Sequence, residues 1–152
     1  MNYLTIEKAK MLIKQFNIPH FFNDVLDEKL SYPLDIYFTC PVVYFLNKEE
    51  QAAYMLGDII PLWADIGGYI HYAYDINQQN FISFDIEEGS IEKRYSWDEI
   101  MKKIIGIAIE YECDEHDSIE QTIGSVKDYF ACIEISNFDL LAEKCRLEYI
   151  NS

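Results

Sequence analysis

The side chains best able to do chemistry are concentrated in one stretch, residues 110–117. The stretch contains the thiol of Cys113, the imidazole of His116 and five carboxylates, those of Glu110, Glu112, Asp114, Glu115 and Asp117. Carboxylates, thiols and imidazoles are the side chains that bind calcium and zinc in proteins. Their density in residues 110–117 makes a metal site the first hypothesis to weigh.

The spacing in residues 110–117 does not suit either metal. A calcium loop of the EF-hand type needs a glycine at its sixth position and a glutamate at its twelfth, and this stretch has no glycine. A zinc site needs further ligands at a suitable spacing, and His20 and His71 do not provide them. We therefore predict no metal and interpret the stretch as an acidic helix end that runs into a solvated loop. A small metal-dependent hydrolase that uses Asp114 and His116 remains an alternative.

Other sequence patterns of enzymes are missing. Gly67-Gly68 is expected in a turn between strands rather than in a phosphate-binding loop before a helix, and there is no G-x-S-x-G motif. We expect His71 to be a surface or sheet-edge histidine. The adjacent carboxylates of Glu87 and Glu88 are common in any protein this acidic. The sequence therefore predicts a protein that is not an enzyme and has no cofactor.

The charge of the chain favours a basic partner. The 27 acidic and 12 basic residues give a formal net charge of −15, and residues 77–152 contribute twice the negative excess of residues 1–76. A field of this sign repels nucleic acid and anionic membranes, and it speeds encounters with basic proteins. We predict a basic protein partner, no nucleic acid and no membrane. The alternative is that the acidity only keeps the protein in solution.

Four widely spaced cysteines and the N-terminal residues bear on location. Cys40, Cys113, Cys132 and Cys145 form no C-x-x-C pair. The first eight residues lack the basic flank and apolar run of a signal peptide, and no apolar stretch approaches the roughly 20 residues of a membrane helix. We expect a cytoplasmic protein with four buried, reduced thiols.

Length and hydrophobic periodicity predict a single domain, residues 1–152, that is rich in helix. Thr5 is the expected N-cap of the first helix and Asn47 that of a later one. Pro33 and Pro41 exclude one continuous helix or central strand over residues 30–47. The predicted helices cover residues 5–17, the segment after Pro19, residues 47–56, 96–112 and 118–131, and a final segment from about Ser136 that buries Phe138, Leu141, Cys145 and Tyr149.

The middle of the chain predicts an antiparallel sheet. Residues 59–64 are apolar around Pro61, which suits an edge strand or the start of a strand. Residues 69–76 and 82–86 alternate between apolar and polar, and the polar turn 77–80 between them predicts a hairpin. Ser96 and Glu99 form a capping box that begins a helix expected to cover one face of the sheet. The fold class is therefore α+β, with a central antiparallel sheet flanked by helices.

The aromatic residues next to acids are candidates for an interface. Most tyrosines are expected in the core, yet a tyrosine-rich strand beside carboxylates also resembles a surface that selects a charged partner. The candidate partner-binding residues are Tyr69, His71, Asp85, Glu87, Glu88, Glu110, Glu112, Asp114, Glu115 and Asp117.

Several short segments resemble the SUKH superfamily of bacterial immunity proteins and fungal cell-wall-synthesis regulators. They are the apolar strand at residues 58–65, the turn and strand at residues 67–75, the helix start at residues 96–100 and the proline–acid–aromatic segment at residues 33–37. The chain departs from the family pattern at residues 40–44, where a glycine-rich segment is usual. The resemblance covers about residues 30–112.

The resemblance implies both a fold and a function. It implies an α+β fold with a central antiparallel sheet. It also implies a cytoplasmic immunity protein that binds and blocks a polymorphic toxin, often a nuclease. A regulatory scaffold of the fungal branch is the alternative within the family.

Overall fold

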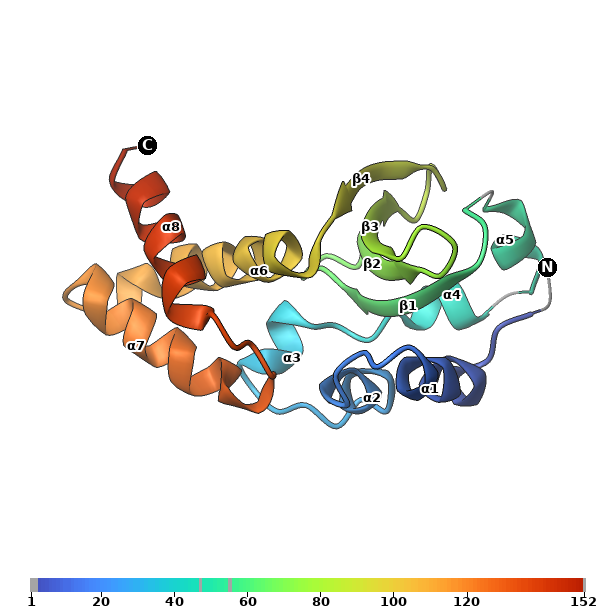
Figure 1. Cartoon of the computed structure of the whole chain (residues 1–152), viewed down its shortest axis with the longest axis horizontal. Coiled ribbons are helices and arrows are strands. Elements are labelled where there is room, and N and C mark those ends of the chain that lie inside the picture. The colour runs from blue at the N-terminus through green and yellow to red at the C-terminus, as the bar shows by residue number, and fades with distance from the viewer. Residues whose placement is uncertain (1–2, 47, 55, 152) are drawn as a thin grey trace. The chain divides into compact units, whose positions relative to one another are not determined.

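The computed structural model describes residues 3–46, 48–54 and 56–151, which form two compact units, Met1–Tyr95 and Ser96–Ser152. The first unit contains an antiparallel sheet flanked by helices, and the second contains helices (Figure 1). The predicted α+β class is confirmed. The assignment of residues 1–152 to one domain stays a prediction.

The sheet is a four-stranded meander of order β1-β2-β3-β4. Its strands are β1 (Ile59–Ala64), β2 (Ile70–Asp75), β3 (Asn80–Asp85) and β4 (Ile91–Tyr95). The predicted hairpin is β2–β3, and its turn forms because the Asp75 carboxylate accepts hydrogen bonds from the backbone N–H groups of Asn77 and Gln78. Asx turns of this kind favour aspartate before a chain reversal.

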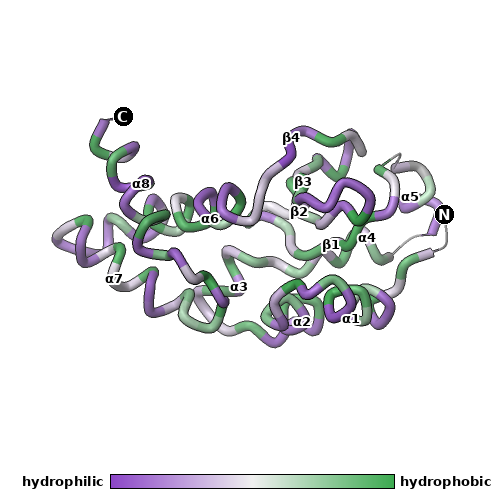
Figure 2. Tube along the Cα trace, in the orientation of Figure 1, coloured by the Kyte–Doolittle hydropathy of each residue, from purple (hydrophilic) through white to green (hydrophobic). Residues whose placement is uncertain are grey.

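The two outer strands differ in how well the sequence reveals them. Pro61 lies in the edge strand β1, as predicted, and Thr39 extends this edge by one isolated bridge to Ala64. The sequence analysis did not predict β4, whose central residues are all charged and exposed. Figure 2 shows the hydrophilic character of much of this strand.

The described part of the first unit contains five helices that flank the sheet. They are α1 (Ile6–Gln15), α2 (Phe21–Leu26), α3 (Leu34–Tyr37), α4 (Val42–Leu46) and α5 (Lys48–Ala53). Thr5 caps α1 by accepting a hydrogen bond from the backbone N–H of Lys8, which confirms that prediction. Pro33 and Pro41 directly precede α3 and α4, so the segment breaks into short helices. The predicted cap Asn47 lies outside the described residues.

Aromatic side chains cover both faces of the sheet. On one face Phe22 of α2 stacks on Trp63, with ring centroids 5.4 Å apart. On the other face Tyr44 of α4 packs on Phe84, with ring centroids 6.2 Å apart. His71 pairs with Phe84 in the sheet register and is only 1% exposed, so the prediction of a surface or sheet-edge histidine is wrong.

The second unit is built on the predicted capping box. Ser96 Oγ accepts from the backbone N–H of Glu99, and the Glu99 carboxylate accepts from that of Ser96, at 3.1 and 3.0 Å. The helices are α6 (Trp97–Glu112), α7 (Ile119–Tyr129) and α8 (Phe138–Ile150), with 3₁₀ turns at Cys113–Glu115 and Phe130–Cys132. Within this unit α6 packs against α7 and α8. Its predicted packing on the sheet stays a prediction.

Two details of the sequence analysis need correction. Tyr149 of α8 is 43% exposed rather than buried, because it lies in the last turn of the helix. All four cysteines are free thiols, but only Cys145 is buried, while Cys132 is exposed and the other two are half-buried. Within the described residues, no helix is both long and apolar enough to cross a membrane.

Candidate functional site

Two turns of the meander bring several predicted partner-binding residues together. In an antiparallel meander, the β1–β2 and β3–β4 turns lie at the same end of the sheet. Ile70 pairs with Asp85, and the backbone N–H of Ile86 donates to the carbonyl oxygen of Tyr69 at 2.8 Å. We call this region the acidic sheet end, and its side chains are Asp65, Ile66, Tyr69, Asp85, Glu87 and Glu88.

Aspartates hold both turns of the acidic sheet end in place. Asp65 Oδ1 accepts from the backbone N–H groups of Tyr69 and Ile70 at 3.0 and 3.2 Å. Asp85 Oδ1 accepts from the backbone N–H of Glu87 at 2.8 Å. These bonds fix the backbone that presents Tyr69 and Glu87, so the surface is ordered before any partner arrives.

The acidic sheet end exposes both apolar and charged side chains. Tyr69 is 58% exposed and Ile66 is 54% exposed. Glu87 and Glu88 are also exposed, and within the described residues neither forms an ion pair. An aromatic anchor beside charged residues is the composition that protein interfaces favour.

The β3–β4 turn rests on an aromatic cluster. Gly89 has a φ of +68°, and a Cβ atom at this position would lie 2.8 Å from Cδ1 of Tyr54. The Tyr54 ring in turn packs on Phe84 and stacks on Tyr44, with ring centroids 6.0 and 5.7 Å away. Glycine is therefore required at residue 89 for both conformation and space.

His71 supports the β1–β2 turn from inside the sheet. Its Nε2 lies 3.2 Å from the carbonyl oxygen of Gly68. Because a carbonyl only accepts, Nε2 carries the proton, and the buried Nδ1 has no hydrogen-bond partner among the residues that the structure describes. Burial lowers the pKa of His71, an effect that the hydrogen bond to Gly68 and the charges of Asp65 and Asp85 partly oppose. His71 thus positions the turn from within, and its burial corrects its prediction as a partner contact.

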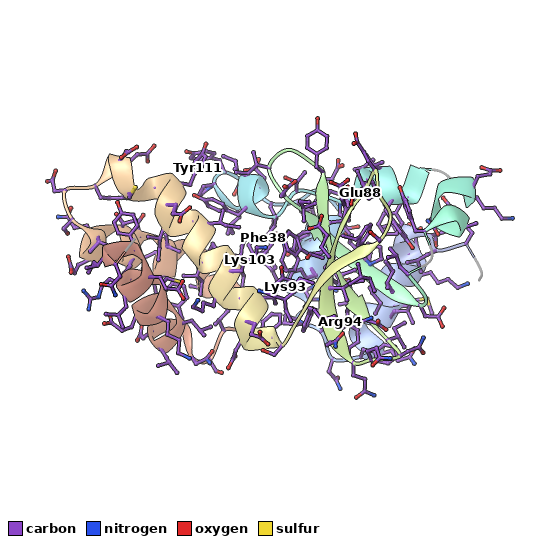
Figure 3. The ribbon with its side chains drawn as sticks, turned by 90° about the horizontal axis from the view of Figure 1, so that it is seen from above. Phe38, Glu88, Lys93, Arg94, Lys103 and Tyr111 are labelled. Atoms are coloured by element: carbon purple, nitrogen blue, oxygen red, sulfur yellow. The ribbon has the colours of Figure 1, made fainter. Side chains whose placement is uncertain are left out.

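The opposite end of the sheet uses its acid internally. Arg94 Nη1 donates to Asp75 Oδ2 and to Asn80 Oδ1, each at 2.9 Å. Asp75 Oδ1 accepts the two backbone bonds of the β2–β3 turn, and its side chain is only 5% exposed. We call Asp75, Asn80 and Arg94 the closed sheet end. Figure 3 shows Arg94 and Glu88 at opposite ends of the sheet.

The acidic stretch of residues 110–117 lies in the second unit, where α6 ends. Its exposed carboxylates belong to Glu110, Asp114, Glu115 and Asp117, as expected for a solvated acidic helix end. Glu112 differs, because its side chain is only 3% exposed. Its Oε2 lies 3.7 Å from Nε2 of His116. Its burial removes Glu112 from the residues that a partner could touch directly.

The predicted site residues therefore separate into two groups. The structure gathers Tyr69, Asp85, Glu87 and Glu88 in the first unit, and the exposed acids of residues 110–117 in the second. Among the described residues, no group of three or more His, Cys, Asp or Glu side chains could hold a metal ion. Sequence reasoning missed Asp65 and Ile66, although the Asp65-Ile66-Gly67-Gly68 turn could have indicated them.

Comparison with known proteins adds no further constraint on the site. No family model matches the chain, and neither a curated protein nor a solved structure matches it. The case for function therefore depends on the geometry of the chain and on its chemistry.

Proposed function

We propose that this chain is an immunity protein that binds a basic protein toxin in a one-to-one complex and thereby blocks it. The observation that carries the proposal is the acidic sheet end, where one turn exposes Tyr69 and Ile66 and the other turn, at the same end of the sheet, exposes Glu87 and Glu88. The proposal also draws on the SUKH resemblance of residues 30–112, which supplies the toxin and the cytoplasmic location.

Charge would select the partner. The first unit contains 14 acidic and seven basic residues, and the second contains 13 acidic and five basic residues. Both units therefore attract a basic surface and repel an acidic one. Such a field raises association rates and suppresses encounters with partners of like charge. The acidic helix end, with Glu110, Asp114, Glu115 and Asp117, would add to this attraction.

Tyr69 would supply most of the affinity at the acidic sheet end. Tyrosine buries a large area on binding and loses little conformational freedom. The hydrogen bonds of Asp65 and Asp85 already order the two turns, so little entropy is lost when the partner binds. Glu87 and Glu88 would pair with lysine or arginine around the aromatic contact.

Co-purification from the native host tests the proposal. The tagged chain is purified, and the proteins that accompany it are identified by mass spectrometry and weighed as an intact complex. The proposal predicts one basic partner at one-to-one stoichiometry, which is toxic when expressed alone and harmless when expressed with this chain.

Two outcomes would contradict the immunity proposal. Several substoichiometric partners would favour a regulatory scaffold. Absence of a partner, together with a tightly held metal whose loss follows His116→Ala or Asp114→Ala, would favour a small hydrolase.

A further inference from the structure

A cavity in the first unit shares no residue with the acidic sheet end, although its Thr39 is bridged to Ala64, the residue before Asp65. Its volume is about 270 Å³, and residues around α2, α3 and α4 line it. Its lining combines apolar and polar side chains, and the residues are Val25, Leu30, Phe38 and Val42 together with Glu28, Asp35, Thr39 and Cys40. Figure 3 labels Phe38, which is buried in the first unit.

The charge of the cavity is negative. Glu28 and Asp35 line it, whereas no lysine, arginine or histidine does so among the described residues. The Nζ atoms of nearby Lys10 and Lys29 lie 2.8 and 3.9 Å from Oδ2 of Asp27 instead. Within residues 3–46, 48–54 and 56–151, no ion pair involves Glu28 or Asp35.

The Cys40 thiol reports on conditions inside the cavity. Burial, followed by the nearby charges of Glu28 and Asp27, raises the pKa of Cys40 to about 11. A negative thiolate is therefore disfavoured beside Glu28, and the thiol stays neutral at physiological pH. The carboxylates of Glu28 and Asp35 are exposed at the cavity, and the negative charge there favours a positively charged group.

We propose that this cavity receives the side chain of one lysine or arginine from a protein partner. The aliphatic stem would lie on Val25, Leu30 and Val42, and the charged head would reach Glu28 and Asp35. Long basic side chains match this division because an apolar stem carries a charged tip. A bare metal ion would leave the apolar wall unused, and a neutral apolar ligand would leave the carboxylates desolvated without a partner.

The surface beside the cavity fits the same occupant. Val42 and Val43 of α4 are 37% and 43% exposed, so the chain that carries the basic residue would find apolar area at the rim. The identity of the occupant as a protein side chain rests on the proposed function, and the charge preference rests on the cavity alone. The cavity would thus act as a second anchor point for a basic partner.

A titration of the full chain with small analogues of arginine tests the proposal. Methyl resonances of Val25, Leu30 and Val42 are followed by NMR while 1-butylguanidinium is added. The same titration with 1-butylurea, which has nearly the same shape and no charge, is the matched ligand control. We expect saturable shifts with the cation and an affinity about fivefold lower for the urea, because one partly exposed ion pair contributes about that much.

Two variants assign the charge preference to particular residues. Glu28→Gln combined with Asp35→Asn should reduce the affinity for 1-butylguanidinium about fivefold, to that of the urea. Glu87→Gln combined with Glu88→Gln removes the same charge at the acidic sheet end and should leave the titration unchanged. If the NMR spectrum shows that the first double variant is unfolded, Glu28→Gln is titrated alone. We expect a smaller loss of affinity for 1-butylguanidinium in that variant.

Three results would overturn the proposal. They are equal affinity for the two ligands, an unchanged titration in the variants of Glu28 and Asp35, and the absence of saturable shifts at the cavity methyl groups. Each of them leaves the immunity function open, because that function is tested by the co-purified partner and this titration uses the isolated chain.

Discussion

The two ends of the sheet use the same turn chemistry for different purposes. Asp75 ends β2 and Asp85 ends β3, and each carboxylate accepts backbone hydrogen bonds from the turn that follows. At the closed sheet end, Arg94 neutralises Asp75. At the acidic sheet end, Glu87 and Glu88 add further negative charge. One end thus uses its carboxylate to hold strands together, while the other leaves charge available to a partner.

The register of β4 explains this asymmetry. Arg94 lies opposite Ile82, which places its guanidinium across the sheet near Asp75 and Asn80. Lys93 lies over the ring of Tyr95, with Nζ 5.1 Å from the ring centroid. Both basic residues of β4 therefore make contacts away from the β3–β4 turn that contains Glu87 and Glu88.

The largest expected effect is at the closed sheet end. Asp75→Ala removes the carboxylate that pairs with Arg94 and accepts from two backbone N–H groups, and the Asp75 side chain is nearly buried. We expect the free energy of unfolding to fall by about 3 kcal/mol, measured by urea denaturation. Glu88→Ala is the control at the acidic sheet end and should change stability by less than about 0.5 kcal/mol. Equal losses in the two variants would remove the distinction between the ends.

The next effect is on binding rather than stability. Tyr69→Ala should weaken the complex with the co-purified partner by about 2 kcal/mol, because an exposed tyrosine at an interface is a typical hot spot. Met11→Ala, which removes a 71% exposed side chain on α1, should leave affinity unchanged. Neither variant should unfold the protein. Loss of affinity in the Met11 variant alone would place the interface elsewhere.

The third effect is a pH dependence that arises beneath the acidic sheet end. Burial lowers the pKa of His71 below its ordinary value of 6.5, so the unfolded state takes up a proton first as pH falls. The stabilising contribution of neutral His71 is therefore complete above pH 6.5 and is lost below it, by at most about 1.4 kcal/mol per pH unit.

Urea denaturation at pH 7.5 and pH 5.5 measures this contribution. The wild-type protein should lose about 1 kcal/mol more than His71→Gln between the two values. Identical dependence in the wild type and in His71→Gln would show that His71 does not couple pH to this end of the sheet.

The smallest effect concerns the support of the β3–β4 turn. Gly89→Ala should cost about 1 kcal/mol, because the new Cβ atom meets Tyr54 and φ is positive. Gly124→Ala in α7 is the control, since nothing lies within 4 Å of the added Cβ atom and alanine favours the helix. Thermal denaturation should move in opposite directions for the two variants, and a stabilising Gly89→Ala would mean that Tyr54 does not support the turn.

Local signals in the sequence revealed the regular elements well. The Ser96–Glu99 capping box began α6 as predicted, and the polar turn after Asp75 produced the β2–β3 hairpin. These features depend on hydrogen bonds between residues close in sequence, which a pattern can reveal. The strand β4 has no apolar alternation, since Glu92, Lys93 and Arg94 are consecutive, and it was missed for that reason.

Burial at the candidate site could not be predicted because it depends on distant residues. His71 is buried because Phe84 lies opposite it on β3 and helices cover both faces of the sheet. Glu112 is buried near His116, although its neighbours Glu110 and Asp114 are exposed. Alternation and charge alone assigned both residues to the surface. Glu87 and Glu88 were placed correctly on the surface, because they lie in the exposed β3–β4 turn.

The measurement that tests the central claim most directly is calorimetric titration of the co-purified partner against two charge-reversal variants. Glu87→Lys combined with Glu88→Lys changes the acidic sheet end, and Glu7→Lys combined with Asp128→Lys changes net charge equally at exposed positions elsewhere. We predict that the first variant binds at least about tenfold more weakly, while the second stays within about threefold of the wild type. Equal losses in both variants would mean that only the overall charge attracts the partner, and would contradict an interface at the acidic sheet end.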